Sequence, residues 1–564
     1  MIRSARTASP LIGLLLLVGC SQTEVTPPAS GNAGNGVAGT TGGSGSSGAG
    51  GASAAGMGGT STGGAGGTGN GTAGTGVAGS GAAGAPGGQS GSSAGRGGAG
   101  GAAGGNAGRG GASGGAAGAT AGRGGAAGGA AGRGGAAGGG VAGSGGSVAC
   151  TITPTTTMST QIPTVAVVTF TTTLTGVTGA SIQFGLPGAT PMVAPVDIAE
   201  ASYRTLLLGL KGSHDYVYRI VVNSAAGSCT SQDVMVRTGA VPSTVPRPTR
   251  TIPMPSAHAP GFIITSGGTT MGSGGGDAIP AYILDGDGEP VWWATAPSSC
   301  SRAKMSWDGK EMWMQELNVD NAGGEMRKVA MDGTGNMVVT GLDKGHHDFT
   351  PLPDGGIALC LWNTTGMDAH NSVVERSASG QMTTIVADVN TLYNSTSFHP
   401  NAIHYYYSDN SYTISDRNVN LFVKITRSGQ LVWQLGGSNP KGQAFTISGG
   451  TWMVNHGHHL LANGNFLFFS NGPFNGNPPS QALEYSLNTT SWTATRVWSY
   501  QASGVNSAVL SDAQRLPNGN TLVTYSVPGT IHEVSPTGQI VMSLDTASLG
   551  YAEYRDSLYG PPLR

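Results

Sequence analysis

Several histidines recur at one position of a repeated pattern, and they are the residues best suited to form a reactive site. His347 precedes Leu352 by five residues, and Leu352 opens a Pro-Asp-Gly turn. His456 has the same spacing before Leu461 and its Asn-Gly-Asn turn, and His399 falls at nearly this place in another unit. An imidazole near neutral pH can act as a nucleophile, as a general acid or base, or as a metal ligand. Histidines matched in this way predict a shared site.

The elements that must position these histidines are short strands separated by Gly, Asp and Asn turns, at a period of roughly 40–50 residues typical of propeller blades. Periodicity of 3.6 residues is not convincing anywhere among them. We count six units, with seven as the main alternative: roughly 260–297, 298–344, 345–390, 397–437, 452–500 and 507–545. Because the first strand of a blade lines the central channel, His347, His399 and His456 should converge at one mouth of that channel.

The neighbouring histidines are less securely placed by the pattern. Strand alternation predicts that His458 shares the face of His456, and that His459 does not. His404 lies an odd number of residues beyond His399, so in a regular strand it would face the other way. His346 adjoins His347 and has no assigned role.

Composition divides the chain into four parts. Residues 1–20 read as an export signal, with Arg3 and Arg6 before a short apolar run. Residues 21–147 are rich in Gly, Ala and Ser and cannot bury enough apolar area to fold, so we expect a disordered tether. Residues 148–247 carry short β-rich runs, and residues 248–564 carry the repeated units. The formal net charge of −2 gives no electrostatic case for a nucleic-acid partner.

The cysteines fit an exported protein. Leu17-Val18-Gly19-Cys20 resembles a bacterial lipobox, which implies lipidation of Cys20 and a membrane anchor. Ser21 after that cysteine favours the outer membrane, with the folded part facing the periplasm or the outside. The other four cysteines permit three pairings, of which Cys150–Cys229 with Cys300–Cys360 keeps each bridge within one domain.

The region 148–247 resembles a fibronectin type III domain. Leu210 precedes Tyr216 by six residues, and Tyr216 opens the alternating run to Val221. In such a sandwich this tyrosine forms the corner before a central strand. Tyr216 is therefore expected to serve the fold and not a ligand.

The repeated region is similar to the bacterial arylsulfotransferase family over most of residues 260–545. The motifs that carry the resemblance are Gly345-His346-His347-Asp348-Phe349, Phe398-His399-Pro400-Asn401, Ile414-Ser415-Asp416-Arg417, Asn455-His456, Asn471-Gly472 and Leu431-Val432-Trp433. The resemblance implies an all-β, six-bladed propeller behind a small fibronectin III or immunoglobulin-like sandwich. It also implies transfer of a sulfuryl group from a phenolic sulfate ester to a phenol, without a nucleotide donor or other cofactor.

The same resemblance assigns roles to residues. His456 would be the nucleophile that becomes sulfated, in a ping-pong reaction. His347, His399, Asn401 and Arg417 would bind and polarise the sulfuryl oxygens, with one histidine serving as general acid or base. Fixed cationic donors suit a transition state whose negative charge spreads over three oxygens. Gly457-His458-His459 departs from the family's pattern after the nucleophile, and His458 is a rival candidate for that role.

Two other functions compete with sulfotransfer. The propeller of an envelope or surface lipoprotein can bind a glycan, a peptide or a phenolic ligand without catalysis. Three histidines on one channel can also hold zinc or copper, but Arg417 among them would repel a cation, so we predict no metal.

Overall fold

The computed structural model of the chain describes residues 149–267, 278–296, 300–316, 324–362, 371–395 and 398–563. The expected export signal, the lipidation site Cys20 and the tether 21–147 lie outside the described residues. Within these ranges the chain is built from strands, with three short 3₁₀ turns: η1 (Ala201–Tyr203), η2 (Pro255–Ala257) and η3 (Val389–Thr391). Among the described residues, no helix is long and apolar enough to cross a membrane.

The first described region is a sandwich of two antiparallel sheets. The smaller sheet has the order β1-β2-β5, with bounds β1 (Ile152–Met158), β2 (Ala166–Thr172) and β5 (Thr205–Leu207). The larger sheet has the order β4-β3-β6-β7, and β8 also pairs with β6; its bounds are β3 (Val177–Gly185), β4 (Met192–Val196), β6 (Asp215–Ser224), β7 (Gly227–Thr230) and β8 (Val234–Arg237). Buried and more exposed residues alternate along β6, as a half-buried strand requires.

The tyrosine at the start of β6 serves the fold, as the sequence predicted. The Tyr216 hydroxyl accepts a hydrogen bond of 2.8 Å from the backbone N–H of Lys211, and both Tyr216 and Leu210 are buried. This is the contact of a tyrosine corner, which ties the loop before a central strand to that strand. The predicted Cys150–Cys229 disulfide is present, with its Cα atoms 6.0 Å apart.

The remaining strands form six sheets of four or five strands within the described residues, all antiparallel except that β25 pairs in parallel with β29. The first three sheets are β10 (Phe262–Gly267), β11 (Ala278–Asp285) and β12 (Pro290–Ala296) with β34 (Leu549–Arg555); β13 (Cys300–Met305), β14 (Glu311–Glu316), β15 (Met326–Ala330) and β16 (Met337–Val338); and β17 (Gly345–Pro351), β18 (Ile357–Trp362), β19 (Asn371–Arg376) and β20 (Met382–Val386). The last three are β21 (Pro400–Tyr406), β22 (Ser411–Asp416), β23 (Leu421–Thr426) and β24 (Leu431–Gly436); β25 (Thr446–Ser448), β26 (Asn455–Leu460), β27 (Asn465–Ser470), β28 (Gln481–Asn488) and β29 (Thr493–Tyr500); and β30 (Asp512–Arg515), β31 (Thr521–Tyr525), β32 (Thr530–Val534) and β33 (Ile540–Asp545) with β9 (Thr249–Thr251).

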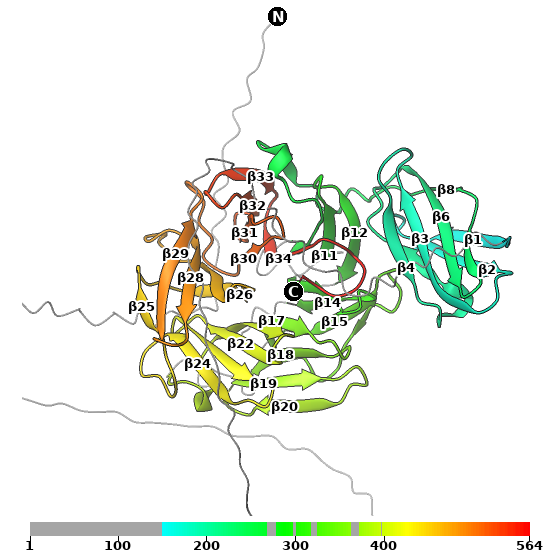
Figure 1. Cartoon of the computed structure of the whole chain (residues 1–564). Helices are drawn as coiled ribbons and strands as arrows, with labels where there is room; N and C mark the ends of the chain where they lie inside the picture. The colour runs from blue at the N-terminus through cyan, green and yellow to red at the C-terminus, as the bar shows by residue number, and fades with distance from the viewer. Residues whose placement is uncertain are drawn as a thin grey trace, which may run out of the picture. The chain divides into compact units, whose positions relative to one another are not determined.

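These sheets surround a centre, as Figure 1 shows. Each innermost strand lies against the innermost strand of the next sheet, in the order β34, β13, β17, β21, β26, β30 and back to β34. The architecture is a β-propeller, and its sheets follow the six repeat units expected from the turn spacing.

Two strands from opposite ends of this region close the ring, which the repeat count did not foresee. The late strand β34 pairs antiparallel with β10 and supplies the inner edge of the first sheet. The early strand β9 pairs with β33 and supplies the outer edge of the sixth sheet. Neither sheet is therefore built from one continuous segment of the chain.

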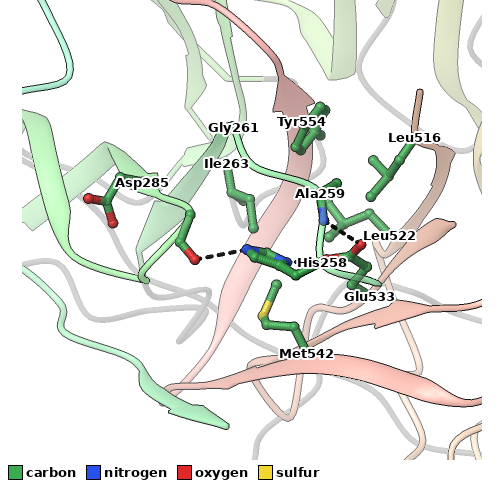
Figure 2. A pocket seen from close by; sticks show the side chains of 11 residues that line it. His258, Ala259, Gly261, Ile263, Asp285, Leu516, Leu522, Glu533, Met542 and Tyr554 are labelled. Carbon is green, nitrogen blue, oxygen red and sulfur yellow. Dashed lines mark hydrogen bonds and ion pairs between the residues drawn. The ribbon is translucent and has the colours of Figure 1, made fainter. Parts of the chain in front are cut away.

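A small pocket at this closure is filled by structural contacts. Between the first and sixth sheets, His258 forms an ion pair through Nδ1 with Glu533, and its Nε2 lies 3.0 Å from the carbonyl oxygen of Gly286 (Figure 2). The backbone N–H of Ala259 and the amide of Asn520 also donate to the Glu533 carboxylate. These contacts hold the segment before β10 against both sheets.

The predicted Cys300–Cys360 disulfide is wrong. Both residues are buried free thiols. Cys300 begins the inner strand β13 and packs in the core of the first two sheets, whereas Cys360 lies in β18 and packs in a separate core of the third and fourth sheets. Because the two side chains belong to different packing clusters, they do not meet, and burial raises the pKa of each thiol well above its ordinary value.

The inner strands are interrupted near the same end of the channel. Pairing registers shift between Cys300 and Arg302 in β13, between Gly345 and Phe349 in β17, between Pro400 and Ala402 in β21, and between His456 and His458 in β26. A bulge adds an unpaired residue and re-aims the side chains around it. The predicted histidines all lie at or beside these bulges.

Candidate active site

The structure brings His347 and His399 together. His347 lies in β17 and His399 directly precedes β21, and their Nε2 atoms are 3.1 Å apart. The His346 ring lies against both, with ring centroids 4.6 Å from each. Three imidazoles from two neighbouring sheets thus form one cluster at the bulged end of the channel.

His456 is held in a defined orientation by Asn471. The amide nitrogen of Asn471 donates to the carbonyl oxygens of Ser507 at 2.7 Å and Leu510 at 3.0 Å, which fixes the amide oxygen as the atom that faces His456. That oxygen lies 2.5 Å from His456 Nδ1, so Nδ1 must carry the proton. His456 Nε2 is therefore the nitrogen with a free lone pair, as a nucleophile requires.

Arg417 supplies the positive charge of the site. It directly follows β22, its side chain is buried, and its backbone N–H donates to the carbonyl oxygen of His399 at 3.3 Å. The preceding Asp416 accepts from the Tyr393 hydroxyl and from the backbone N–H groups of His399 and Asn418. Burial nevertheless raises the pKa of Asp416 to about 6. Through its three hydrogen bonds, the Asp416 carboxyl group fixes the loop that carries His399.

Burial and Arg417 together keep the site histidines neutral. Burial and, to a lesser extent, the Arg417 charge together lower the pKa of His347 to about 4. For His346, His399 and His456 the same two causes, together with neighbouring histidines, lower the pKa well below 6.5. The site thus offers neutral imidazoles beside one guanidinium, and a bound anion would restore charge balance.

Asn401 is the bulged residue of β21 and is fully buried. Its amide nitrogen donates to the carbonyl oxygen of Asn455 at 2.7 Å, while its amide oxygen has no partner among the described residues. The Tyr551 hydroxyl donates to the backbone oxygen of Asn401 at 3.3 Å. Asn401 thus ties β21 to the strand that carries His456.

His458 does not share the face of His456, contrary to the prediction from alternation. The bulge at Gly457 adds one residue, so the side chains beyond it change face. His458 is buried between the fourth and fifth sheets, where Nε2 lies 2.7 Å from Thr413 Oγ1 and the ring stacks on Phe466. His458 is therefore a core residue and no rival to His456.

His459 and His404 lie further along the inner strands β26 and β21. Their ring centroids are 4.5 Å apart, and His459 Nε2 is 3.4 Å from the Asp512 carboxylate. Asn401 is a bulge between His399 and His404, so the strand is not regular there and the odd spacing does not decide which way His404 faces. Neither ring joins the cluster of His346, His347 and His399.

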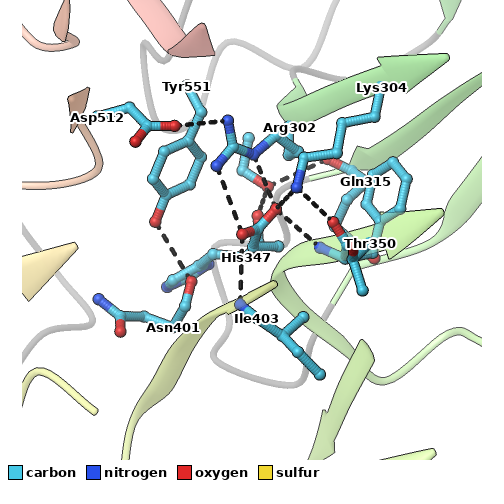
Figure 3. Close-up of polar contacts among 12 residues, drawn as sticks. Arg302, Lys304, Gln315, His347, Thr350, Asn401, Ile403, Asp512 and Tyr551 are labelled. Atoms are coloured by element: carbon cyan, nitrogen blue, oxygen red, sulfur yellow. Dashed lines mark hydrogen bonds and ion pairs between the residues drawn. The ribbon is translucent and has the colours of Figure 1, made fainter. Parts of the chain in front are cut away.

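A buried charge network forms the floor of the site (Figure 3). Arg302 donates through Nε to Asp348 at 2.7 Å and through Nη1 to Asp512 at 3.0 Å. Lys304 Nζ lies 3.1 Å from Asp348, and the Arg302 guanidinium lies 4.0 Å from the centre of the Tyr551 ring. The two cations and two carboxylates balance, and they join the inner strands β13, β17 and β30.

Tyr551 and Asn471 are site residues that the histidine pattern missed. The Tyr551 ring lies between Arg302 and the His456 ring, whose centroid is 6.3 Å away. It comes from β34, which follows the last repeat unit, so no repeat signal marks it. Asn471 was visible only as part of an Asn-Gly turn after β27.

The histidine cluster could in principle hold a metal, since ligand atoms of His346, His347 and His399 all lie within 4.8 Å of one another. The donor set does not favour a cation, however. His346 Nδ1 accepts from the backbone N–H of His347 at 3.0 Å, which leaves the proton on Nε2, the atom that would have to be a ligand. With Arg417 beside these rings, the arrangement fits an oxyanion better than a metal ion.

The fold and site define a β-propeller with a buried cluster of neutral histidines beside one arginine. The family model of arylsulfotransferases (ASST) matches residues 363–547. The match includes His399, Asn401, Arg417 and His456, and leaves out His347 and Tyr551. It supports sulfotransfer involving small aromatic molecules in general. A search of curated proteins finds no match.

Solved structures similar to the chain are distant. A putative 6-phosphogluconolactonase from Bacteroides fragilis is 12% identical, with a TM-score of 0.35, over 53% of this chain and 99% of that one. An inactive virginiamycin B lyase from Staphylococcus aureus, solved with quinupristin, is 14% identical, with a TM-score of 0.33, over 55% and 97%. A protein of unknown function from Bacteroides caccae is 14% identical, with a TM-score of 0.34, over 52% and 98%. Likenesses this remote carry no argument about activity.

Proposed function

We propose that the protein is an aryl-sulfate sulfotransferase that moves a sulfuryl group from a phenolic sulfate ester to a phenol through a sulfated His456. The observation that carries the proposal is the fixed tautomer of His456, whose lone pair at Nε2 belongs to the same buried centre as Arg417 and the His347–His399 pair. The arylsulfotransferase match, which covers His399, Arg417 and His456, supports it.

In the first half of the reaction, His456 Nε2 attacks sulfur, and an N–S bond forms as the aryl O–S bond breaks. The donor leaves as a phenolate, which takes a proton from solvent. His456 Nδ1 keeps its proton and its hydrogen bond to Asn471, so the sulfated ring is an imidazolium held by a neutral acceptor. Arg417, His347 and His399 stabilise the charge that spreads over the sulfuryl oxygens.

In the second half, the acceptor phenol attacks sulfur, and the N–S bond breaks to return the lone pair to Nε2. The phenol's proton passes to the unprotonated Nε2 of the His347–His399 pair and then to solvent. No nucleotide donor or other cofactor takes part. One site serves both halves, so the kinetics should be ping-pong.

The test is transfer from p-nitrophenyl sulfate to a phenol acceptor by the purified chain, with mass spectrometry of the peptide that contains His456. We expect a sulfated His456 when donor is present alone, and at least a roughly thousandfold loss of transfer in His456→Ala. His214→Ala is the matched control, since His214 lies in the sandwich and binds the carbonyl oxygen of Gly212. Transfer by His456→Ala at the native rate would contradict the nucleophile assignment. An inactive but folded native chain would favour a binding protein.

We also propose that the protein is an exported lipoprotein of the cell envelope, anchored through Cys20. The Cys150–Cys229 disulfide supports an oxidising compartment. Incorporation of labelled palmitate into the native chain, and its loss in Cys20→Ala, would test the anchor.

A further inference from the structure

Two buried N–H groups at the histidine cluster have no hydrogen-bond partner among the described residues. They are Nε2 of His346 and Nε1 of Trp362. His346 is 2% exposed, and the Trp362 nitrogen is enclosed although the rest of its ring is half-buried. An unpaired buried donor is costly, and native proteins rarely keep one without a reason.

Both groups act as donors. His346 Nδ1 is occupied as an acceptor by the backbone N–H of His347 at 3.0 Å, so the neutral ring carries its proton on Nε2. Burial and neighbouring positive charge keep that ring neutral. The indole nitrogen of Trp362 can only donate. The two N–H groups therefore lack a hydrogen-bond acceptor, and a second donor could not satisfy them.

These donors adjoin the groups already assigned to the sulfuryl site. The His346 ring centroid is 4.7 Å from that of Trp362 and 4.6 Å from those of His347 and His399. The Trp362 and His399 centroids are 5.9 Å apart. The two open N–H groups therefore belong to the same buried cluster as the His347–His399 pair, and Arg417 adds a positive charge beside them.

We propose that His346 and Trp362 form a further oxygen-binding subsite, in which Nε2–H and Nε1–H donate to one oxygen of the substrate's sulfuryl group. The subsite rests on the proposed sulfotransfer for its substrate. It would bind a tetrahedral oxyanion even if no transfer occurred. Both donors are neutral, so they orient the oxygen through directed hydrogen bonds. Arg417 supplies the positive charge that attracts the anion.

A metal is the main rival occupant of the same cluster. Ligand atoms of His346, His347 and His399 lie within 4.8 Å of one another. To ligate through Nε2, His346 would have to move its proton to Nδ1 and give up the hydrogen bond from His347. The two occupants therefore require opposite tautomers of His346, and they can be told apart.

The test uses Trp362→Phe, which removes the indole N–H and keeps an aromatic ring. Trp452→Phe is the matched control, because Trp452 Nε1 is also buried without a partner but lies in the core of the fourth and fifth sheets. We expect Trp362→Phe to raise the KM for p-nitrophenyl sulfate roughly tenfold, about the loss of one hydrogen bond to a charged group, and to reduce the thermal stabilisation by inorganic sulfate. Trp452→Phe should change neither. His346→Phe should weaken sulfate binding at least as much.

The outcomes separate the subsite from the function. If the native chain transfers sulfate and Trp362→Phe keeps the native KM and sulfate response, the subsite is wrong and the function stands. If the native chain does not transfer but binds sulfate in a Trp362-dependent way, the subsite stands and the function fails. Stoichiometric Zn²⁺ binding by calorimetry that is lost in His346→Phe would overturn the subsite in favour of the metal.

Discussion

Asn471 decides what His456 can do. The Asn471 amide has both its donors committed to the carbonyl oxygens of Ser507 and Leu510, so its oxygen is left to accept from His456 Nδ1. The imidazole can then present only Nε2 to the substrate. Asn471, in the loop after β27, therefore fixes the tautomer of His456 through these hydrogen bonds.

Asn471→Ala should therefore lower kcat for sulfotransfer roughly hundredfold, because the His456 ring can turn and expose its protonated nitrogen. The KM for the aryl sulfate should change little, since Arg417 and the other histidines remain. Steady-state kinetics with thermal unfolding on the same sample would check this. Asn465→Ala, which removes an amide bound to Glu484 at the far end of β27, is the control. An unchanged kcat in a folded Asn471→Ala would refute the role.

At this scale the spacing predicted that His347 and His399 meet, but it missed His346, whose ring lies against both. His347, His399 and His456 were found because equal spacing before a turn means an equal place on a blade. Hydrogen-bond partners such as Asn471, and donors such as Trp362, depend on side-chain positions that no spacing encodes.

At the scale of the strand, the bulges explain why the sequence misplaced His458. A strand alternates faces with period two, so one extra residue at Gly457 reverses every assignment after it. The glycine itself is explained by close approach: a Cβ there would meet Asp512 Oδ1 at 2.1 Å and the Asp512 Cα at 2.8 Å. Close packing of β26 against β30 therefore explains the glycine in Gly457-His458-His459, the segment that departs from the family's pattern. The position of His456, which precedes the bulge, is unaffected.

Gly457→Ala should consequently lower the free energy of unfolding by about 2 kcal/mol, and lower kcat as the strand carrying His456 shifts. Denaturant unfolding and transfer assays would measure both effects. At Gly179 an added Cβ meets nothing within 4 Å, so Gly179→Ala is the control. Native stability in Gly457→Ala would show that β26 and β30 are not in contact at this point.

For the whole molecule, the buried histidines predict a loss of stability in acid. The pKa values of His346, His347, His399, His404, His456 and His458 are lowered by burial. Below about pH 6.5 the unfolded chain therefore takes up protons that the folded chain refuses, and folding loses about 1.4 kcal/mol per pH unit for each such histidine. Groups with a raised pKa oppose this slope: His258 through Glu533, Asp285 through burial, and Asp416, whose pKa burial raises to about 6.

The histidines with a lowered pKa, which also include His532, outnumber the opposing groups, so unfolding at pH 5 should take up more than one proton. The apparent unfolding temperature should fall steadily between pH 7 and pH 5, as differential scanning calorimetry across that range would show. A flat profile would mean that the rings are protonated in the folded state.

The count of blades was predictable because each unit repeats the same turn chemistry, but the closure of the ring was not. Strands β9 and β34 carry no repeat signal, and their pairing joins segments far apart in the chain. The sequence also could not show that Cys300 and Cys360 stay unpaired. An even number of cysteines suggests disulfides, but it does not reveal that these two lie in different cores.

The closing strand has a consequence for how the protein comes into being. Strand β34 follows every other strand of the six sheets in the order of synthesis, and it carries Tyr551 to the floor of the site beside Arg302 and Asn401. Until β34 pairs with β10 and packs against the neighbouring inner strands, the ring stays open. The Tyr551 ring then does not yet cover the Arg302–Asp512 ion pair. We therefore expect a growing chain to complete the ring and the site in the same final step.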